Sequence, residues 1–203
     1  AQDNMWAFSN PEIKAILCNI GGNDSVKLLP YLDAEVIKRN PKIFCGYSDA
    51  MTIHLYLYKL GLMSYYGDNL LTVVAEQNGW HDYSRESFIK TFFCNKRIGR
   101  IEPAKEWSHS KNNHTNPMYR KQYMQSFDYE VIQGDGQVTG RLIGGHGDLL
   151  EIGKDAAIKL VEKDFEGAIL FFEDIEEVCT LEYIEDFFDK LGRSWILKRL
   201  NGI

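Results

Sequence analysis

Ser48 is the residue of this sequence best placed for covalent chemistry. It lies in Gly46-Tyr47-Ser48-Asp49, between the apolar run 43–45 and a helix-like stretch at 50–60. A serine on a tight turn between a strand and a helix can project its hydroxyl from the sheet edge, while the following amides face charge developing on a bound carbonyl. The same residue types are ordinary in turns and helix N-caps, so local sequence leaves both a nucleophile and a structural turn open.

A second turn of chemical interest is the glycine-rich stretch Gly21-Gly22-Asn23-Asp24-Ser25. It directly follows residues 13–20, which are predicted to form a short buried strand. A strand that runs into a glycine-rich turn places backbone amides at the edge of a sheet. The turn lacks the lysine of a P-loop and the GxGxxG pattern, so a phosphate-binding module is disfavoured.

Strands and helices alternate in the first part of the chain, as they do in a parallel α/β sheet. The helix at 50–60 is apolar on nearly every side, as expected for a helix buried against a sheet, and it ends near Gly61. An earlier helical segment is interrupted by Pro30. The predicted strands are 13–20, 43–45 and 62–66.

The composition of the sequence changes after about residue 95, where a polar, turn-rich segment shows little helical or strand periodicity. Beyond it, alternating residues on either side of Gly134-Asp135-Gly136 predict a hairpin of strands 129–132 and 138–143. Helices are predicted at 149–161 and 181–191, with a buried strand at 168–172 between them. We therefore predict an N-terminal α/β domain at 1–94, a connecting or binding loop region at 95–133 and a C-terminal β/α domain at 134–203.

Composition excludes several classes of function. Acidic residues outnumber basic ones by 29 to 23 and no block of lysine or arginine appears, so neither a nucleic-acid partner nor an anionic membrane is expected. The four cysteines show neither zinc-site spacing nor a disulfide framework. The N-terminus lacks the features of a signal peptide and no run approaches about 20 apolar residues. A cytoplasmic protein without a metal or cofactor is expected.

Three separated blocks resemble one known family. The first combines Asn19–Ser25, Leu28–Asp33 and Asn40–Asp49; the second is Thr139–Gly145 and the third Ala168–Asp174. Together they resemble peptidase family S66, the LD-carboxypeptidases and the related microcin C self-immunity proteins, and the resemblance spans essentially the whole chain. It implies a partial Rossmann-like (flavodoxin-like) N-terminal domain with a parallel sheet, followed by a smaller swivelling β/α C-terminal domain.

The resemblance also implies a serine peptidase mechanism and the residues that perform it. Ser48 is then the nucleophile, and Glu173 is the carboxylate that orients the base. The amide of Asp49, with an amide of Gly21 or Gly22, would form the oxyanion hole. The family uses no metal or cofactor and is commonly a homodimer.

Two residues are expected to bind substrate, Asn23 and Trp107. Trp107 lies in a segment similar to the loop that, in the microcin-immunity branch, places an indole against adenine. A planar aromatic face suits that stacking, although a tryptophan that covers a domain junction is an equal alternative. The expected substrate is accordingly a murein peptide with an L,D bond or an aminoacyl or peptidyl adenylate.

The sequence departs from the family where the catalytic base should be. The family histidine lies in a segment beyond the point where this sequence stops, and the family also has elements before the segment resembling residues 4–8. The chain therefore resembles the middle of the family fold, and the alternative function is a catalytically inactive fragment or remnant that only folds or binds.

The histidines and the other acids of the sequence are expected to have ordinary structural roles. For the histidines we expect a core or interface residue at His54, a rim residue at His81, solvated loop residues at His109 and His114, and a turn residue at His146. Among the acids, Asp49 is expected to cap its helix, and a solvated strand end is expected at Asp174, Glu176 and Glu177.

Overall fold

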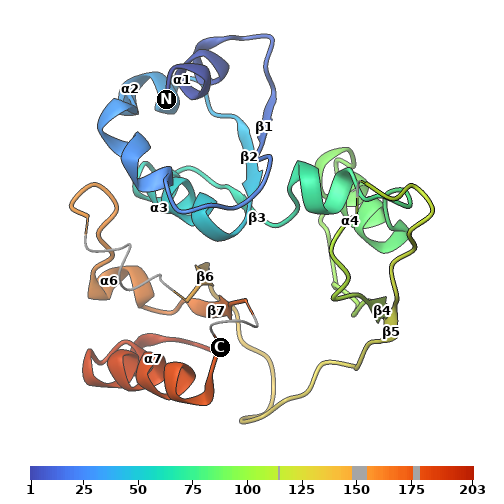
Figure 1. Cartoon of the computed structure of the whole chain (residues 1–203). Helices are drawn as coiled ribbons and strands as arrows, with labels where there is room; N and C mark the ends of the chain where they lie inside the picture. Colours follow the sequence, from blue (N-terminus) through green and yellow to red (C-terminus); the bar gives the residue numbers. More distant parts are fainter. Residues whose placement is uncertain (114, 148–154, 176–178) are drawn as a thin grey trace. The chain divides into compact units, whose positions relative to one another are not determined.

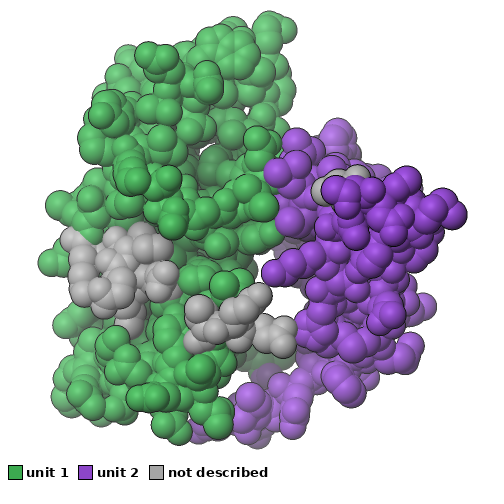
Figure 2. All heavy atoms as spheres, viewed as in Figure 1, with its two compact units in different colours: residues 1–67, 137–203 green, residues 68–136 purple. Residues whose placement is uncertain are grey.

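A computed structural model describes residues 1–113, 115–147, 155–175 and 179–203 of the chain. It divides into two compact units (Figure 2). Unit 1 combines residues 1–67 with 137–203, and unit 2 contains residues 68–136. Residues 68–94 therefore belong to the same compact unit as the loop-rich segment that follows them, whereas the sequence analysis assigned them to the N-terminal domain. The domain boundaries at 94 and 134 stay a prediction.

The first half of unit 1 is built on a parallel sheet of three short strands in the order β1-β2-β3 (Figure 1). Ala15 pairs with Ile43, and Cys45 pairs with Tyr65. Because all three strands are parallel, their carboxyl ends meet at one edge, where the two predicted turns also begin. The strands are β1 (Ala15–Leu17), β2 (Ile43–Gly46) and β3 (Tyr65–Tyr66).

Short helices connect these strands. The α2 helix begins after Asp33, whose carboxylate accepts hydrogen bonds from the amides of Glu35 and Val36 at 2.9 and 3.0 Å. In α3, every residue from Met51 to Leu57 is buried, as its apolar sequence predicted. The bounds are α1 (Gln2–Ser9), the 3-10 segments η1 (Ser25–Tyr31) and η2 (Ser48–Ala50), α2 (Ala34–Arg39) and α3 (Met51–Lys59).

The second half of unit 1 contains the parallel pair β6 (Leu142–His146) and β7 (Ile169–Glu173). The last residues of the chain lie along β7, where Gly202 forms a parallel bridge with Ile169. The remaining elements are α6 (Glu162–Phe165), α7 (Leu181–Arg193) and the 3-10 turn η4 (Leu197–Arg199). The α/β prediction with parallel sheets is confirmed, including the predicted strand at 168–172 and the helix at 181–191.

One hydrophobic core joins the two halves of unit 1. Burying apolar surface from both halves in a common cluster favours their packing as one body. Its most deeply buried members are Phe8, Ile37, Met51 and Leu57 from the first half and Ile158, Phe165, Ala168, Leu170 and Leu191 from the second.

Two predictions for the chain after residue 128 are wrong. The hairpin is absent: residues 129–132 form no strand, and β6 pairs in parallel with β7. Tyr129, Val131 and Ile132 are exposed, so their alternation has no buried face to stabilise a strand. The helix at 149–161 is also wrong for residues 155–161, which form a turn followed by an irregular segment; residues 148–154 lie outside the described residues.

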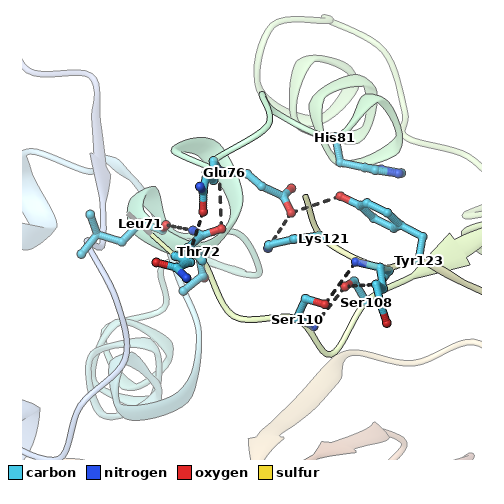
Figure 3. A network of polar contacts seen from close by, with 12 residues as sticks. Leu71, Thr72, Glu76, His81, Ser108, Ser110, Lys121 and Tyr123 are labelled. Atoms are coloured by element: carbon cyan, nitrogen blue, oxygen red, sulfur yellow. Dashed lines mark hydrogen bonds and ion pairs between the residues drawn. The ribbon is translucent and has the colours of Figure 1, made fainter. Parts of the chain in front are cut away.

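A network of polar contacts connects several segments of unit 2 (Figure 3). The Glu76 carboxylate pairs with Lys121 at 2.6 Å and accepts a hydrogen bond from the Tyr123 hydroxyl at 3.2 Å. Ser108 donates to the carbonyl of Gln122 at 2.6 Å. The elements are a π-helical turn η3 (Leu70–Val74), α4 (Asp82–Phe92) and an antiparallel pair of two-residue strands, β4 (Glu106–Trp107) and β5 (Met124–Gln125). Within the described residues, no helix is both long and apolar enough to cross a membrane.

Candidate active site

Ser48 occupies the turn directly between β2 and the helical segment that continues into α3, as the sequence predicted. Its φ is +58°, in the left-handed region that residues with a side chain rarely adopt. Holding such a residue there costs on the order of 1–3 kcal/mol, and such strain concentrates at functional sites. A strained serine between a strand and a helix is the geometry of a nucleophile turn.

Gly46 and His54 support this turn from the inside. A Cβ at Gly46 would lie 2.6 Å from the Cys18 sulfur and 3.1 Å from Cβ of Ala50, so only glycine fits. His54 Nε2 lies 2.9 Å from the Gly46 carbonyl oxygen, and Nδ1 lies 2.8 Å from the Ser64 hydroxyl. Because a carbonyl only accepts, Nε2 carries a proton, and in the neutral ring Nδ1 accepts a hydrogen bond from the Ser64 hydroxyl. Burial lowers the pKa of His54 to about 4 despite the bond to Gly46, so the core assignment of His54 is confirmed.

The glycine-rich loop at 21–25 lies directly against the Ser48 turn. A Cβ at Gly21 would come within 2.9 Å of the Ser48 Cβ and 3.1 Å of its Oγ. The Asp49 carboxylate holds the loop: one oxygen accepts hydrogen bonds from the amides of Asp24 and Ser25, at 3.0 and 2.9 Å, and from the Ser25 hydroxyl at 2.8 Å. The cap expected from Asp49 is therefore wrong, because its side chain binds the neighbouring loop.

Tyr66, at the end of β3, connects Ser48 with Glu173. Its hydroxyl accepts a hydrogen bond from the Ser48 amide at 2.8 Å and donates one to Glu173 Oε1. Burial and the bond to Glu173 raise the pKa of Tyr66, so the phenol stays protonated. The sequence interpretation missed Tyr66, because an aromatic residue at a strand end has the same local signature as a core residue.

His146 and Asp174 form a second polar cluster beside Glu173. His146 is the register partner of Glu173 in the β6–β7 pair, and its Nε2 lies 3.0 Å from Asp174 Oδ1. The other Asp174 oxygen accepts from the Tyr183 hydroxyl at 2.7 Å. The Asp174 side chain is 0% exposed, so its expected role as a solvated acid is wrong, and His146 ends a strand rather than forming a turn.

The remaining candidates within the described residues belong to the glycine-rich loop and to unit 2. Asn23 is exposed in the glycine-rich loop. Trp107 belongs to β4 of unit 2, is 40% exposed, and contacts His109 edge to face at a centroid distance of 4.2 Å. His81 lies 3.2 Å from Glu106 and stacks on Tyr123. His114, Glu176 and Glu177 lie outside the described residues.

The site can therefore offer a strained serine, a close backbone loop and a carboxylate linked to the serine turn. Acyl transfer through a serine nucleophile uses these three kinds of group. The described residues contain no group of three or more histidines, cysteines and acids able to hold a metal ion.

Comparison with known families places both halves of unit 1 in one family. Residues 1–67 match the LD-carboxypeptidase N-terminal domain, and residues 139–203 match the LD-carboxypeptidase C-terminal domain. The two matches contain all the residues singled out above in unit 1.

Similar curated proteins come from several bacteria. The microcin C7 self-immunity protein MccF of Escherichia coli is 32% identical over 207 residues, covering 100% of this chain and 58% of that protein. A Bacillus subtilis protein named "Putative carboxypeptidase YocD" is 34% identical, covering 86% of this chain and 55% of its own length. The chain thus spans somewhat more than half the length of these relatives.

Solved structures show the same similarity. An MccF-like protein from Streptococcus pneumoniae in complex with AMP superposes with a TM-score of 0.87 at 28% identity, over 99% of this chain and 64% of that one. MccF in complex with aspartyl sulfamoyl adenosine gives a TM-score of 0.82 at 30% identity, over 98% and 59% of the two chains.

Proposed function

This chain belongs to peptidase family S66, the LD-carboxypeptidases, and from that premise we propose that it carries the nucleophile of a serine carboxypeptidase or amidase. The observation that carries the proposal is the left-handed backbone of Ser48 between β2 and α3, with the Gly21 backbone against its side chain. A structural turn would not require the residue at this position to be a strained serine.

In the proposed reaction, the Ser48 hydroxyl oxygen attacks the carbonyl carbon of the scissile bond. An ester forms at Ser48 as the bond to the leaving group breaks, and the base passes the serine proton to that group, which is the amine of a murein peptide or the adenosine phosphate or sulfamate part of an adenylate. Water then hydrolyses the ester and releases the acid. The Ser48 amide is bound to Tyr66, so the oxyanion donors are proposed to be the amides of Asp49 and of Gly21 or Gly22. Glu173 is proposed to orient the base, and we assign no histidine of this chain to that base.

For the substrate, we propose an aminoacyl or peptidyl adenylate, with an L,D-linked murein peptide as the second candidate. Two observations favour the adenylate: related structures hold AMP or an aminoacyl sulfamoyl adenosine, and Trp107 leaves part of its indole exposed. Stacking of a base on an aromatic ring is worth about 1–3 kcal/mol. Trp107 and Asn23 are the proposed substrate contacts.

We further propose that the protein acts in the cytoplasm as a homodimer without a metal. All four cysteines are free thiols, as is usual for proteins of reducing compartments. Light scattering on the purified protein tests the dimer, and chelator treatment that abolishes hydrolysis would contradict a metal-free mechanism.

A hydrolysis assay of the full-length protein tests the proposed function. An aminoacyl sulfamoyl adenosine and an L,D-linked murein tetrapeptide are each assayed with the wild type and with Ser48→Ala. We expect hydrolysis of at least one substrate and a loss of about 10⁴-fold or more in Ser48→Ala, as in other serine hydrolases.

The outcomes separate the competing functions. Retention of the full rate in Ser48→Ala would refute the serine mechanism. A folded protein that binds an adenylate but hydrolyses neither substrate would instead support the inactive remnant. Trp107→Ala is the matched test of the base contact: it should raise KM for the adenylate and leave KM for the murein peptide unchanged.

A further inference from the structure

Tyr66 lies where the two halves of unit 1 meet at the candidate active site. We propose that Tyr66 is a positioning residue whose single hydroxyl fixes the Ser48 turn and the Glu173 carboxylate relative to each other. This inference rests on the proposed serine mechanism. It adds to that mechanism a residue that touches neither the reacting atoms nor the base directly.

The hydrogen-bond directions at Tyr66 are determined by the chemistry of its partners. The backbone N–H of Ser48 can only donate, so the phenol oxygen accepts at 2.8 Å. The phenol has one proton, and it is donated to Glu173 Oε1. One atom thus accepts from the nucleophile residue and donates to the orienting acid, which neither phenylalanine nor an aliphatic residue can do.

The ring of Tyr66 is confined by packing from both halves of the unit. His54, on α3, lies at a centroid distance of 5.5 Å, and Phe171, on β7, lies at 5.4 Å. On the β6 side, a Cβ at Gly145 would come within 3.0 Å of the ring and within 2.7 Å of the Met51 sulfur. A ring held by three elements gives its hydroxyl a defined position, which a positioning role requires.

The protonation state of Tyr66 agrees with this role. Burial and the hydrogen bond to Glu173 raise the pKa of the phenol above its ordinary value. The hydroxyl therefore remains a donor at neutral pH and does not act as a base. Loss of this hydroxyl would leave the Ser48 amide and one Glu173 oxygen without this shared partner.

The chain provides a matched control for the substitution Tyr66→Phe. The hydroxyl of Tyr58, on α3, donates to Asp164 Oδ1 at 3.3 Å, so it too joins residues 1–67 to residues 137–203 through a carboxylate. Tyr58→Phe removes the same hydroxyl from a tyrosine–carboxylate contact between the same halves, away from Ser48 and Glu173.

The kinetic experiment compares both variants in the full-length protein with the better of the two substrates. For Tyr66→Phe we expect kcat to fall about 10–100-fold with KM changed less than about threefold, because misplacement of a catalytic group by about 1 Å can cost 10²-fold. For Tyr58→Phe we expect kcat within about twofold of the wild type. Equal kcat values for Tyr66→Phe and wild type would overturn the inference while leaving the proposed function intact.

A second measurement does not depend on turnover. Urea unfolding midpoints are measured for Tyr66→Phe, Glu173→Ala and the double variant. Direct coupling predicts that the double variant loses clearly less than the sum of the two single losses, whereas Tyr58→Phe combined with Glu173→Ala should be additive. Additive losses for Tyr66 and Glu173 would refute the contact. If the wild type hydrolyses neither substrate, the proposed function fails. The unfolding comparison of the single and double variants still decides whether Tyr66 and Glu173 are coupled.

Discussion

Asp49 and His54 show how single side chains stabilise the Ser48 turn through hydrogen bonds to the backbone. Asp49 holds the glycine-rich loop through three hydrogen bonds to one oxygen, and His54 holds the carbonyl of Gly46, two residues before Ser48. Neither side chain needs to react in order to matter. Each satisfies backbone groups that would otherwise be free to move, and so each keeps the strained serine in place.

The buried imidazole of His54 makes stability depend on pH. Its pKa is about 4 in the folded protein against an ordinary value of 6.5, because burial disfavours the charged ring. Between these values the unfolded chain binds a proton that the folded protein does not, so stability falls as pH decreases from about 6.5 to 4. A difference of 2.5 pKa units corresponds to about 3 kcal/mol at the lower limit.

Urea unfolding at pH 7.5, 6 and 5 measures this loss. We expect the wild type to lose stability over the range, and His54→Gln, although less stable at pH 7.5, to show a flatter dependence below pH 6.5. Parallel curves for the two proteins would show that the ring of His54 is not the group that titrates.

At the scale of the element, the close approach of β6 to α3 and β3 requires glycine. Gly145 has a φ of +135°, and a Cβ there would contact both Met51 and Tyr66 at 3.0 Å or less. In contrast, Gly61 also has a positive φ, of +76°, but a Cβ there would meet nothing within 4 Å. A Cβ at Gly145 would therefore meet both backbone strain and steric overlap, whereas a Cβ at Gly61 would meet backbone strain alone.

Gly145→Ala is therefore expected to be more destabilising than Gly61→Ala. Backbone strain alone costs about 1 kcal/mol, and overpacking adds about 1–3 kcal/mol at Gly145. Thermal and urea unfolding measure the difference. Because the new methyl group faces Tyr66, hydrolysis should also decrease in Gly145→Ala and remain near the wild-type rate in Gly61→Ala. Equal losses for the two variants would contradict the packing described for β6.

The elements that the sequence predicted well are those with a local physical signature. The strand, turn and helix around Ser48 follow from an apolar run, a glycine and a fully apolar helix, and the amphipathic helix α7 follows from its period. The predicted hairpin at 129–143 failed because alternation indicates a strand only where one face is buried, and burial depends on the partner strand. Strand pairing in parallel sheets joins distant segments, so local patterns could not reveal that β6 pairs with β7.

At the scale of the whole molecule, side-chain contacts join the two sequence-distant halves of unit 1. Lys59 pairs with Asp164 at 2.5 Å, with side chains 25% and 15% exposed, and Tyr58 donates to the same carboxylate. Burial alone would raise the pKa of Asp164, but hydrogen bonds from Lys59 and from the Val161 amide give a net lowering. The half that carries Ser48 is thus tied to the half that carries Glu173 at a point distinct from Tyr66.

Removal of the Lys59–Asp164 ion pair should destabilise unit 1. Lys59→Met leaves a largely buried carboxylate without its cation, and we expect a loss in urea unfolding between that of an exposed pair, about 1 kcal/mol or less, and that of a fully buried pair, about 3–5 kcal/mol. Lys27→Met is the matched control, since Lys27 pairs with Asp24 on the surface and such exposed pairs contribute less than about 1 kcal/mol. A loss in Lys59→Met no greater than in Lys27→Met would contradict a stabilising contact between the halves.

The contacts between the halves are also what sequence reasoning could not supply. Ser48, Gly21 and Glu173 could be singled out from their motifs, but the bond between Tyr66 and Glu173 joins positions 107 residues apart. No periodicity or spacing rule reports a contact over that separation. The burial of Asp174 escaped prediction for the same reason, since its partners His146 and Tyr183 come from two other elements.

The most direct test of the account is to identify the residue that becomes acylated. The full-length protein is mixed with an aminoacyl sulfamoyl adenosine, quenched in acid during turnover, digested with trypsin and analysed by mass spectrometry. The account predicts an aminoacyl adduct on the peptide 43–59, located at Ser48 by fragmentation and absent from Ser48→Ala, which also loses hydrolysis. An adduct on another residue, or hydrolysis at the wild-type rate in Ser48→Ala, would contradict Ser48 as the nucleophile.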